Sequence, residues 1–312
     1  MEEFANQSST TDFILPGLFT HSGASHFLFS LVCAIFTVAL TANAVLILLI
    51  GVDPRLRTPM YFLLSQLSVL DVSFISVTVP KMAVDFLSGR NVISFPGCGT
   101  QMFFFLLVGA AECLLLGFMA YDRYLAVCHP LRYPVLMSRQ VCLLMVAGSW
   151  MGGILDGAIL TPLTLGFPFC RSREIPHFFC EIPAVLQLSC SDVSRYETRV
   201  FLSGIVFLLL PISFIVASYA FILASVLRMK STEGRQKAFA TCSSHLTVVG
   251  LFYGIIIFMY MTPRSYHTPK QDKTMSVFYT ILTPMMNPLI YSLRNKEVMG
   301  ALGRMMRRCT FA

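Results

Sequence analysis

The sequence predicts an all-α membrane protein, a bundle of seven transmembrane helices followed by a short amphipathic C-terminal helix. Of the 312 residues, 55% are hydrophobic and only 12% are charged, whereas soluble domains carry about 25% charged residues. The apolar residues also form long runs, and a membrane-spanning helix needs about 20 such residues in succession. Seven segments meet this length: residues 27–50, 59–80, 101–121, 142–165, 201–227, 239–261 and 275–293.

The basic residues orient this bundle. An odd number of spans puts the two ends of the chain on opposite sides of the membrane. The loops after the first, third and fifth spans, together with the tail, hold 14 of the 23 basic residues but only four acidic ones. Positive charge favours the cytoplasmic side, so we expect residues 1–24 outside and residues 294–312 inside. The net charge of +7 therefore reflects topology and does not indicate nucleic-acid binding.

The chain is expected to form a single domain, residues 1–312, whose bundle occupies residues 27–293. Residues 1–24 are polar and do not resemble a cleavable signal peptide, so the first span is expected to serve as the signal anchor. Asn6 begins the sequence Asn-Gln-Ser, which fits a glycosylation site on the extracellular side.

The tail after the last span has the pattern of an amphipathic helix. Apolar Val298 and Leu302 are interspersed with basic Arg304 and Arg307. This pattern is typical of a helix lying on the inner membrane surface. Cys309 is a candidate for palmitoylation there, and an unmodified thiol is the equal alternative.

Four of the ten cysteines fall on the predicted extracellular side: Cys98, Cys170, Cys180 and Cys190. An even number in an oxidising compartment predicts two disulfides, for which three pairings are open. The six other cysteines lie in spans or on the reducing side, and we expect them to be free thiols.

One face of the third span carries a regular pattern. A spacing of three and four residues aligns six side chains on it: Phe105, Gly109, Glu112, Leu116, Met119 and Arg123. Glu112 and Arg123 are too costly to expose to lipid, so this face is predicted to line the bundle interior. Phe105 and Gly109 leave room for a ligand near the outside, and Arg123 lies where an intracellular partner would bind.

A second polar feature joins the second, third and seventh spans. Asp71 and Glu112 are expected at similar depth, and two carboxylates in an apolar interior do not both stay ionised without help. They either share a proton or hold a cation, and Asn287 would complete an oxygen-lined sodium site. The alternative is a pair of protonated acids that only tie helices together.

Long motifs resemble those of vertebrate odorant receptors, a branch of the rhodopsin-like G-protein-coupled receptors. The third span ends with MAYDRYLAVCHPLRY (119–133), the second begins with PMYF (59–62), the sixth carries KAFATCSSHL (237–246) and the seventh carries PMMNPLIYSLRN (284–295). These strings occur in order across nearly the whole chain, and the pattern is similar to that of class II receptors.

The resemblance implies a function and several pairings. It implies a plasma-membrane receptor that binds a small volatile odorant and couples to the olfactory stimulatory G protein, raising cAMP. It implies the disulfides Cys98–Cys180 and Cys170–Cys190. It also implies an intracellular switch made of Asp122, Arg123, Tyr219, His245 and Tyr291.

The resemblance further implies an odorant pocket between the third, fifth, sixth and seventh spans. Helical spacing assigns ten residues to it: Phe105, Leu106, Gly109, Ala110, Ser203, Phe207, Ile256, Tyr260, Val277 and Thr280. Bundle packing is the competing interpretation for each. Tyr260 is the strongest candidate, because an apolar pocket needs a few placed polar groups.

The string of His177, Cys180 and Glu181 contains residue types that ligate copper. A disulfide at Cys180 would remove its thiolate, so we expect no native metal site and no cofactor other than the sodium ion considered above.

Two other classes were weighed against a receptor. A transporter or channel would use the intramembrane acids Asp71, Glu112 and Asp156 as a pathway, but the chain has no internal repeat of the kind that transporters often show. A membrane enzyme would need a catalytic motif such as His-Glu-x-x-His or Gly-x-Ser-x-Gly, and the sequence contains neither.

Overall fold

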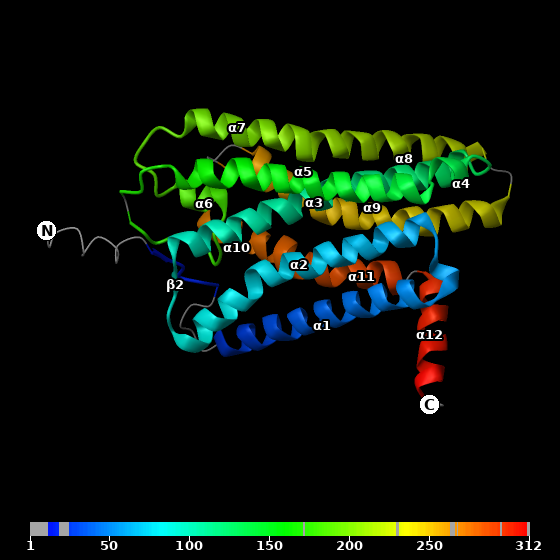
Figure 1. The fold of residues 1–312 in the computed structure, drawn as a ribbon, viewed down its shortest axis with the longest axis horizontal. Helices are drawn as coiled ribbons and strands as arrows, with labels where there is room; N and C mark the ends of the chain where they lie inside the picture. Colours follow the sequence, from blue (N-terminus) through cyan, green and yellow to red (C-terminus); the bar gives the residue numbers. More distant parts are fainter. Residues whose placement is uncertain are drawn as a thin grey trace, which may run out of the picture.

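The computed structural model describes residues 12–18, 25–170, 172–228, 231–262, 266, 268–293 and 295–310. Long helices lie side by side along one axis of the molecule (Figure 1). They are α1 (Ser25–Val52), α2 (Pro59–Ser88), α3 (Phe95–Cys128), α5 (Arg139–Leu165), the run α7–η3–α8 (Ser194–Gly204, Ile205–Leu209, Leu210–Arg228), α9 (Thr232–Met261) and the run α10–η5–α11 (Pro269–Val277, Phe278–Leu282, Thr283–Leu293). Each predicted span lies inside one of them.

The predicted seven-helix bundle is confirmed as the fold class. Within the described part of the chain, six helices are long and apolar enough to cross a membrane. The seventh predicted span lies in the run α10–η5–α11 and is not among these six. The π-helical turn η5 interrupts this run. A similar turn, η3, interrupts the fifth.

The burial pattern is that of a membrane bundle. α3 is central and packs against α2, α5 and α8. Large apolar side chains such as Phe27, Leu144 and Phe221 point outward and are exposed. Because water would not tolerate so extensive an apolar surface, these side chains face lipid.

Two glycines let α5 approach α3 closely. A side chain at Gly153 would overlap the backbone carbonyl of Leu107, and one at Gly157 would lie 2.9 Å from the carbonyl oxygen of Phe103. Small residues four apart allow such backbone contact in membrane helices. This contact fixes the distance between α3 and α5, which both line the cavity described below.

Gly153→Ala is therefore expected to destabilise the fold strongly. The added methyl group meets backbone rather than a movable side chain, and overpacking costs about 1–3 kcal/mol or more. Gly148→Ala is the matched control, because no atom lies within 4 Å of a side chain added there. Thermal unfolding in detergent should show a lower midpoint for Gly153→Ala only. Equal midpoints for both variants would contradict the proposed close contact.

One end of the bundle, here named the disulfide end, carries two short strands and a short loop helix that were not predicted, together with the two disulfides that the family resemblance implies. Strand β1 (Phe13–Ile14) pairs antiparallel with β2 (Val92–Ile93), and Ile14 also bridges to Glu174. The loop between α5 and α7 is held by two disulfides, Cys98–Cys180 and Cys170–Cys190. It contains the short helix α6 (Ile182–Leu186) and covers this end of the bundle.

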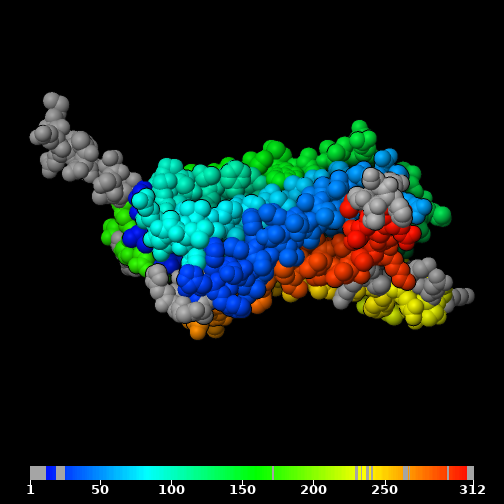
Figure 2. Space-filling view, turned by 90° about the horizontal axis from the view of Figure 1, so that it is seen from below, coloured from blue at the N-terminus to red at the C-terminus, as the bar shows by residue number. Residues whose placement is uncertain are grey.

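The opposite end, here named the α12 end, carries the predicted amphipathic helix as α12 (Lys296–Thr310). It lies crosswise against the bundle (Figures 1 and 2), with Val298 and Ala301 buried. Arg304 donates hydrogen bonds of 3.0 and 2.6 Å to Asp53 and thereby lowers the pKa of that carboxyl. The remaining described segments at this end, η2 (Pro54–Leu56) and α4 (Tyr133–Leu136), are single turns.

Asn6 and the side chain of Cys309 lie outside the described part of the structure, so the modifications predicted there stay predictions. The thiols of Cys33, Cys113, Cys128, Cys142 and Cys242 are free.

Candidate functional site

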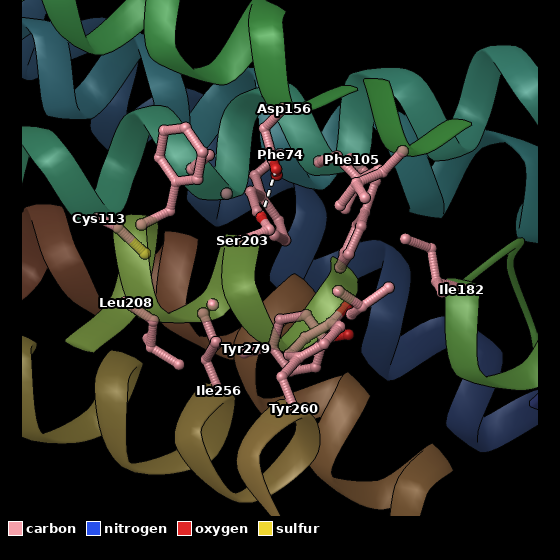
Figure 3. Close-up of a pocket in the computed structure, with 17 residues that line it drawn as sticks. Phe74, Phe105, Cys113, Asp156, Ile182, Ser203, Leu208, Ile256, Tyr260 and Tyr279 are labelled. Atoms are coloured by element: carbon pink, nitrogen blue, oxygen red, sulfur yellow. Dashed lines mark hydrogen bonds between the residues drawn. The ribbon is translucent and has the colours of Figure 1, made fainter. Parts of the chain in front are cut away.

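A cavity of about 80 Å³ lies inside the bundle toward the disulfide end (Figure 3). It is enclosed by α3, α5, the α7–η3 segment and α9, with Ile182 of α6 at the loop side. One water needs about 10–15 Å³ on this measure, so the space admits roughly five to eight water-sized groups. The cavity therefore suits a small organic molecule.

Eight of the ten residues predicted for the pocket line this cavity: Phe105, Leu106, Gly109, Ala110, Ser203, Phe207, Ile256 and Tyr260. Val277 and Thr280 do not line it, so their assignment to the odorant pocket stays a prediction. Thr280 is fully buried and donates a 2.6 Å hydrogen bond to the backbone of Ser276. The π-helical turn η5 adds a residue to this turn, so ordinary helical spacing mispredicts its inward face, and Tyr279 lines the cavity instead.

Nine further residues line the cavity and were not predicted from the sequence: Phe74, Cys113, Asp156, Leu160, Ile182, Val200, Gly204, Leu208 and Tyr279. Most are apolar and carry no signal of their own. Asp156 is different, because an acid inside a span is a functional candidate by default. The sequence places Asp156 in a span but does not place it in the pocket. Whether residues of α5 reach the cavity depends on how closely α5 packs against α3.

Aromatic rings form the wall nearest the loop. The ring of Phe105 lies 5.3 Å from Phe74, 5.0 Å from Phe179 and 5.9 Å from Tyr279, measured between ring centroids. Such pairs bury much apolar area in defined orientations. The wall is therefore rigid and apolar.

The loop closes over the cavity through Glu181. This carboxylate is 1% exposed and accepts hydrogen bonds of 2.8 Å from the hydroxyls of Tyr260 and Tyr279 and of 3.3 Å from Ser276. The neighbouring Cys180 is bonded to α3 by its disulfide. The loop, here called the lid, is thus tied to α3, α9 and the α10–η5 segment at once.

The possible copper string does not form a metal site in the described structure. Cys180 is oxidised to the disulfide, and no cluster of three metal-ligating side chains occurs among the described residues. His177 and Glu181 do lie together, with Nε2 and Oε2 3.5 Å apart.

The protonation states of this pair are set by burial. Burial raises the pKa of Glu181 to about 7, although hydrogen bonds from Tyr279 and Tyr260 oppose the shift. Burial and the charge of Lys273 lower the pKa of His177 to about 3. His177 is therefore neutral at pH 7, and its contact with Glu181 is not an ion pair there.

These two pKa shifts have opposite effects on stability. Between pH 4.5 and about 7 the folded chain keeps a proton on Glu181 that the unfolded chain loses, so stability rises as pH falls. Between pH 6.5 and about 3 the unfolded chain protonates His177 and the folded chain does not, so stability falls as pH falls. Each slope is about 1.4 kcal/mol per pH unit, and the two cancel between about pH 4.5 and 6.5.

Replacing either residue should reveal the effect of the other on the pH dependence of stability. Glu181→Gln is expected to make the fold less stable as pH falls from 6.5 to 5, and His177→Gln is expected to make it more stable over the same range. Thermal unfolding midpoints in detergent measure this, with the unmodified chain as the control for the remaining titrating groups. The same pH dependence in all three proteins would contradict the assignment.

Deeper in the bundle, Asn287 brings together the two acids predicted to form an ion or proton site. Its Nδ2 donates to Asp71 Oδ1 at 2.8 Å and lies 3.5 Å from Glu112 Oε1. Asn43 from α1 donates to the backbone of Pro284 at 2.9 Å. The cluster thus joins α1, α2, α3 and α11.

The oxygens of this cluster suit a hard cation or a shared proton. Asp71 Oδ2 and Asn287 Oδ1 are buried without a hydrogen-bond partner within the described residues, whereas buried polar atoms normally have one. Hard cations prefer carboxylate and amide oxygens. The residues present therefore fit a small hard cation such as sodium.

At the α12 end, the predicted switch residues lie on α3, α8, α9 and α11. Asp122 accepts a 2.7 Å hydrogen bond from Tyr133, and Tyr219 is hydrogen-bonded to His245 Nδ1 at 2.9 Å. Arg123 is buried at 9% exposure. The hydroxyl of Tyr291 has no hydrogen-bond partner in the part of the chain described, so these polar groups are incompletely paired.

A single helix connects all three features. Along α3, Phe105 lines the cavity, Glu112 belongs to the acid cluster and Arg123 lies at the switch. Five of the six residues of the predicted stripe are buried, and Gly109 is partly exposed to the cavity. The cavity, the acid cluster and the predicted switch thus all include residues of one helix.

Comparisons with known proteins agree with the motifs. A family model described as olfactory receptor matches residues 32–308. The chain is 60% identical over 301 residues to human olfactory receptor 2T2, covering 96% of this chain and 93% of that protein. It is 59% identical over 308 residues to human olfactory receptor 2T1, with coverage of 99% and 83%, and 56% identical over 305 residues to human olfactory receptor 2T11, with coverage of 98% and 96%. The predicted resemblance is confirmed, and these relatives are receptors rather than enzymes. The chain is a multi-pass membrane protein that belongs to the olfactory receptor family.

Proposed function

We propose that this receptor binds a small volatile odorant in the cavity and then engages the olfactory stimulatory G protein, which raises cAMP. The observation that carries the proposal is the continuity of α3 from the cavity at Phe105 to the switch at Arg123. A ligand shifts a conformational equilibrium only if it binds one state better than the other. The cavity is lined by residues of several helices, so a ligand there would contact more than one of them and could favour one arrangement over another.

The orientation proposed for the receptor has the disulfide end outside the cell and the α12 end in the cytoplasm of a plasma-membrane protein. Disulfides persist in oxidising compartments, and the loops at the α12 end are rich in basic residues.

Glycosylation at Asn6 would follow from this orientation. A glycosidase-sensitive mass shift that disappears in Asn6→Gln would support it, and glycosidase resistance of the unmodified receptor would count against it. Palmitoylation of Cys309 is tested by palmitate labelling of Cys309→Ser.

Activation is proposed to separate α9 from α3 at the α12 end. His245 would move away from Arg123, and the resulting groove would accept the C-terminal helix of the G protein, a helix-in-groove contact. The hydrogen bond between Tyr219 and His245 would break in this step. Asp122, Arg123 and Tyr291 would then rearrange their incomplete pairing around the incoming helix.

The cluster of Asp71, Glu112 and Asn287 is proposed to bind a sodium ion or to share a proton in the resting state. A cation that favours the resting state must weaken agonist binding by linkage. Raising sodium should then lower agonist potency, and Glu112→Gln should remove that dependence. Equal sodium sensitivity in both receptors would refute a sodium role for the cluster.

The function is tested by an odorant panel applied to cells that express the receptor. We expect at least one small odorant to raise cAMP only when the olfactory stimulatory G protein is present, and Arg123→Ala to abolish the response at unchanged surface level. A response that persists without the G protein, or in Arg123→Ala, would contradict the proposed coupling.

A further inference from the structure

The cavity contains a polar pair that the family motifs do not account for. Ser203 of α7 donates a 2.5 Å hydrogen bond to Oδ1 of Asp156 on α5 (Figure 3). Asp156 is 8% exposed, and it is the one charged side chain among the described residues that line the cavity. The hydrogen bond from Ser203 uses Oδ1, and the described residues make no hydrogen bond to the other oxygen, Oδ2.

The hydrogen-bond donors around the cavity are already in use. The hydroxyls of Tyr260 and Tyr279 donate to Glu181 in the lid, and the hydroxyl of Ser203 donates to Asp156. The thiol of Cys113 is only a weak donor. A ligand that can only accept hydrogen bonds therefore finds no strong free donor among the described lining residues.

The acceptors, in contrast, remain available. A carboxylate has about four lone-pair sites and Asp156 uses one of them for Ser203. A buried polar group with unused capacity is costly in an apolar surrounding. A ligand that donates a hydrogen bond would remove that cost, and one that cannot would leave it in place.

We infer that Asp156 and Ser203 form a subsite for a hydrogen-bond-donating head group, a hydroxyl or a protonated amine, on a ligand with an apolar body. The body would pack against Phe105, Phe207 and Ile256. The inference deepens the proposed function, because it rests on the same cavity and names the class of ligand. It makes Asp156 a specificity-determining residue that selects donors over acceptors of the same shape.

The two kinds of donor differ in how strongly they use the carboxylate. A hydroxyl makes a hydrogen bond, whereas an ammonium group also pairs its charge with Asp156. No lysine, arginine or histidine occurs among the described lining residues to supply that positive charge. Both hydrogen bonds have an ionised acceptor, but only the ammonium group adds a Coulombic attraction to the carboxylate, so the amine should lose more affinity when the charge on Asp156 is removed.

The test measures binding to purified receptor by ligand-induced thermal stabilisation, which requires no G protein. The probes are four molecules with the same saturated six-carbon body that carry a hydroxyl, an amine, a methyl ether or a ketone. We expect the alcohol and the amine to bind at least about tenfold more tightly than the ether and the ketone. In Asp156→Leu this preference should disappear. In Asp156→Asn, which removes the charge and adds an N–H donor, the amine should lose its advantage, and the ether and the ketone should bind more tightly than they do to the unmodified receptor.

Two further variants separate the effect of cavity shape from that of the polar pair. Ile256→Val alters the shape of the cavity without changing its polar groups, so it should shift the alcohol and the ether alike. Ser203→Ala should narrow the gap between alcohol and ether by less than Asp156→Leu does.

Tighter binding of the ether or ketone than of the alcohol, or a donor preference that persists in Asp156→Leu, would overturn the inference. So would the absence of donor binding to the unmodified receptor. Donor-selective binding without any cAMP response in cells would uphold the subsite and contradict the proposed signalling, so the two claims fail separately.

Discussion

Cys98→Ser is expected to abolish surface expression of the receptor. The disulfide Cys98–Cys180 anchors the lid to the start of α3, with its two Cα atoms 5.4 Å apart. Phe179 and Cys180 of the lid are fully buried, so a detached lid would expose a large apolar surface. Loss of a native disulfide typically costs about 2–5 kcal/mol, which is a large fraction of the roughly 5–15 kcal/mol by which native proteins are stable.

Cys33→Ser is the matched control for this prediction. Cys33 is a free, partly exposed thiol on α1, so its replacement removes a sulfur without removing a crosslink. Surface labelling of intact cells separates the two variants. Cys180→Ser should reproduce Cys98→Ser, and the double variant should be no worse, because each removes the same bond. Normal surface levels and signalling in Cys98→Ser would show that the lid folds without its anchor.

The number and place of the spanning helices were predictable because the membrane imposes a length on apolar runs. Each predicted span falls inside an observed helix, and the observed helices differ mainly at their ends. α2, for example, continues to Ser88 although the prediction stopped at residue 80. The hydropathy of the sequence does not predict such extensions, because a helix can continue past the end of an apolar run through residues such as Lys81 and Asp85.

The cavity was predictable only in part, for two physical reasons. Helical spacing identified cavity-lining residues along α3, which is a regular helix. It did not do so around the π-helical turn η5, where the extra residue changes which side chains face inward, and Val277 and Thr280 do not line the cavity. The role of Asp156 depends on the tight contact that Gly153 permits between α5 and α3. Neither the turn nor the contact has a signature in the hydrophobic pattern. The strands β1 and β2 were missed because two-residue pairings are below what alternation can indicate.

The largest effect expected of the intact receptor is reciprocal coupling between odorant and G protein. Cavity and switch lie at opposite ends of α3, so each partner biases the same two arrangements of α3 and α9. Linkage then requires the G protein to tighten odorant binding by the factor by which odorant tightens G-protein binding. A coupling of about 1–3 kcal/mol corresponds to roughly 5–150-fold.

Two variants should affect this coupling in different ways. Asp156→Leu should weaken the binding of donor ligands. For ligands that still bind, the coupling factor should stay the same, because Asp156 lines the cavity and is not one of the switch residues. Arg123→Ala should leave odorant affinity without G protein nearly unchanged and remove the coupling.

The most direct measurement is the affinity of an activating odorant for receptor in lipid nanodiscs, with and without nucleotide-free olfactory stimulatory G protein. We expect the affinity to be higher by about 5–150-fold when the G protein is present, and we expect no such increase in Arg123→Ala. Equal affinities in the unmodified receptor, for an odorant that raises cAMP in cells, would contradict the claim that α3 links the cavity to the switch.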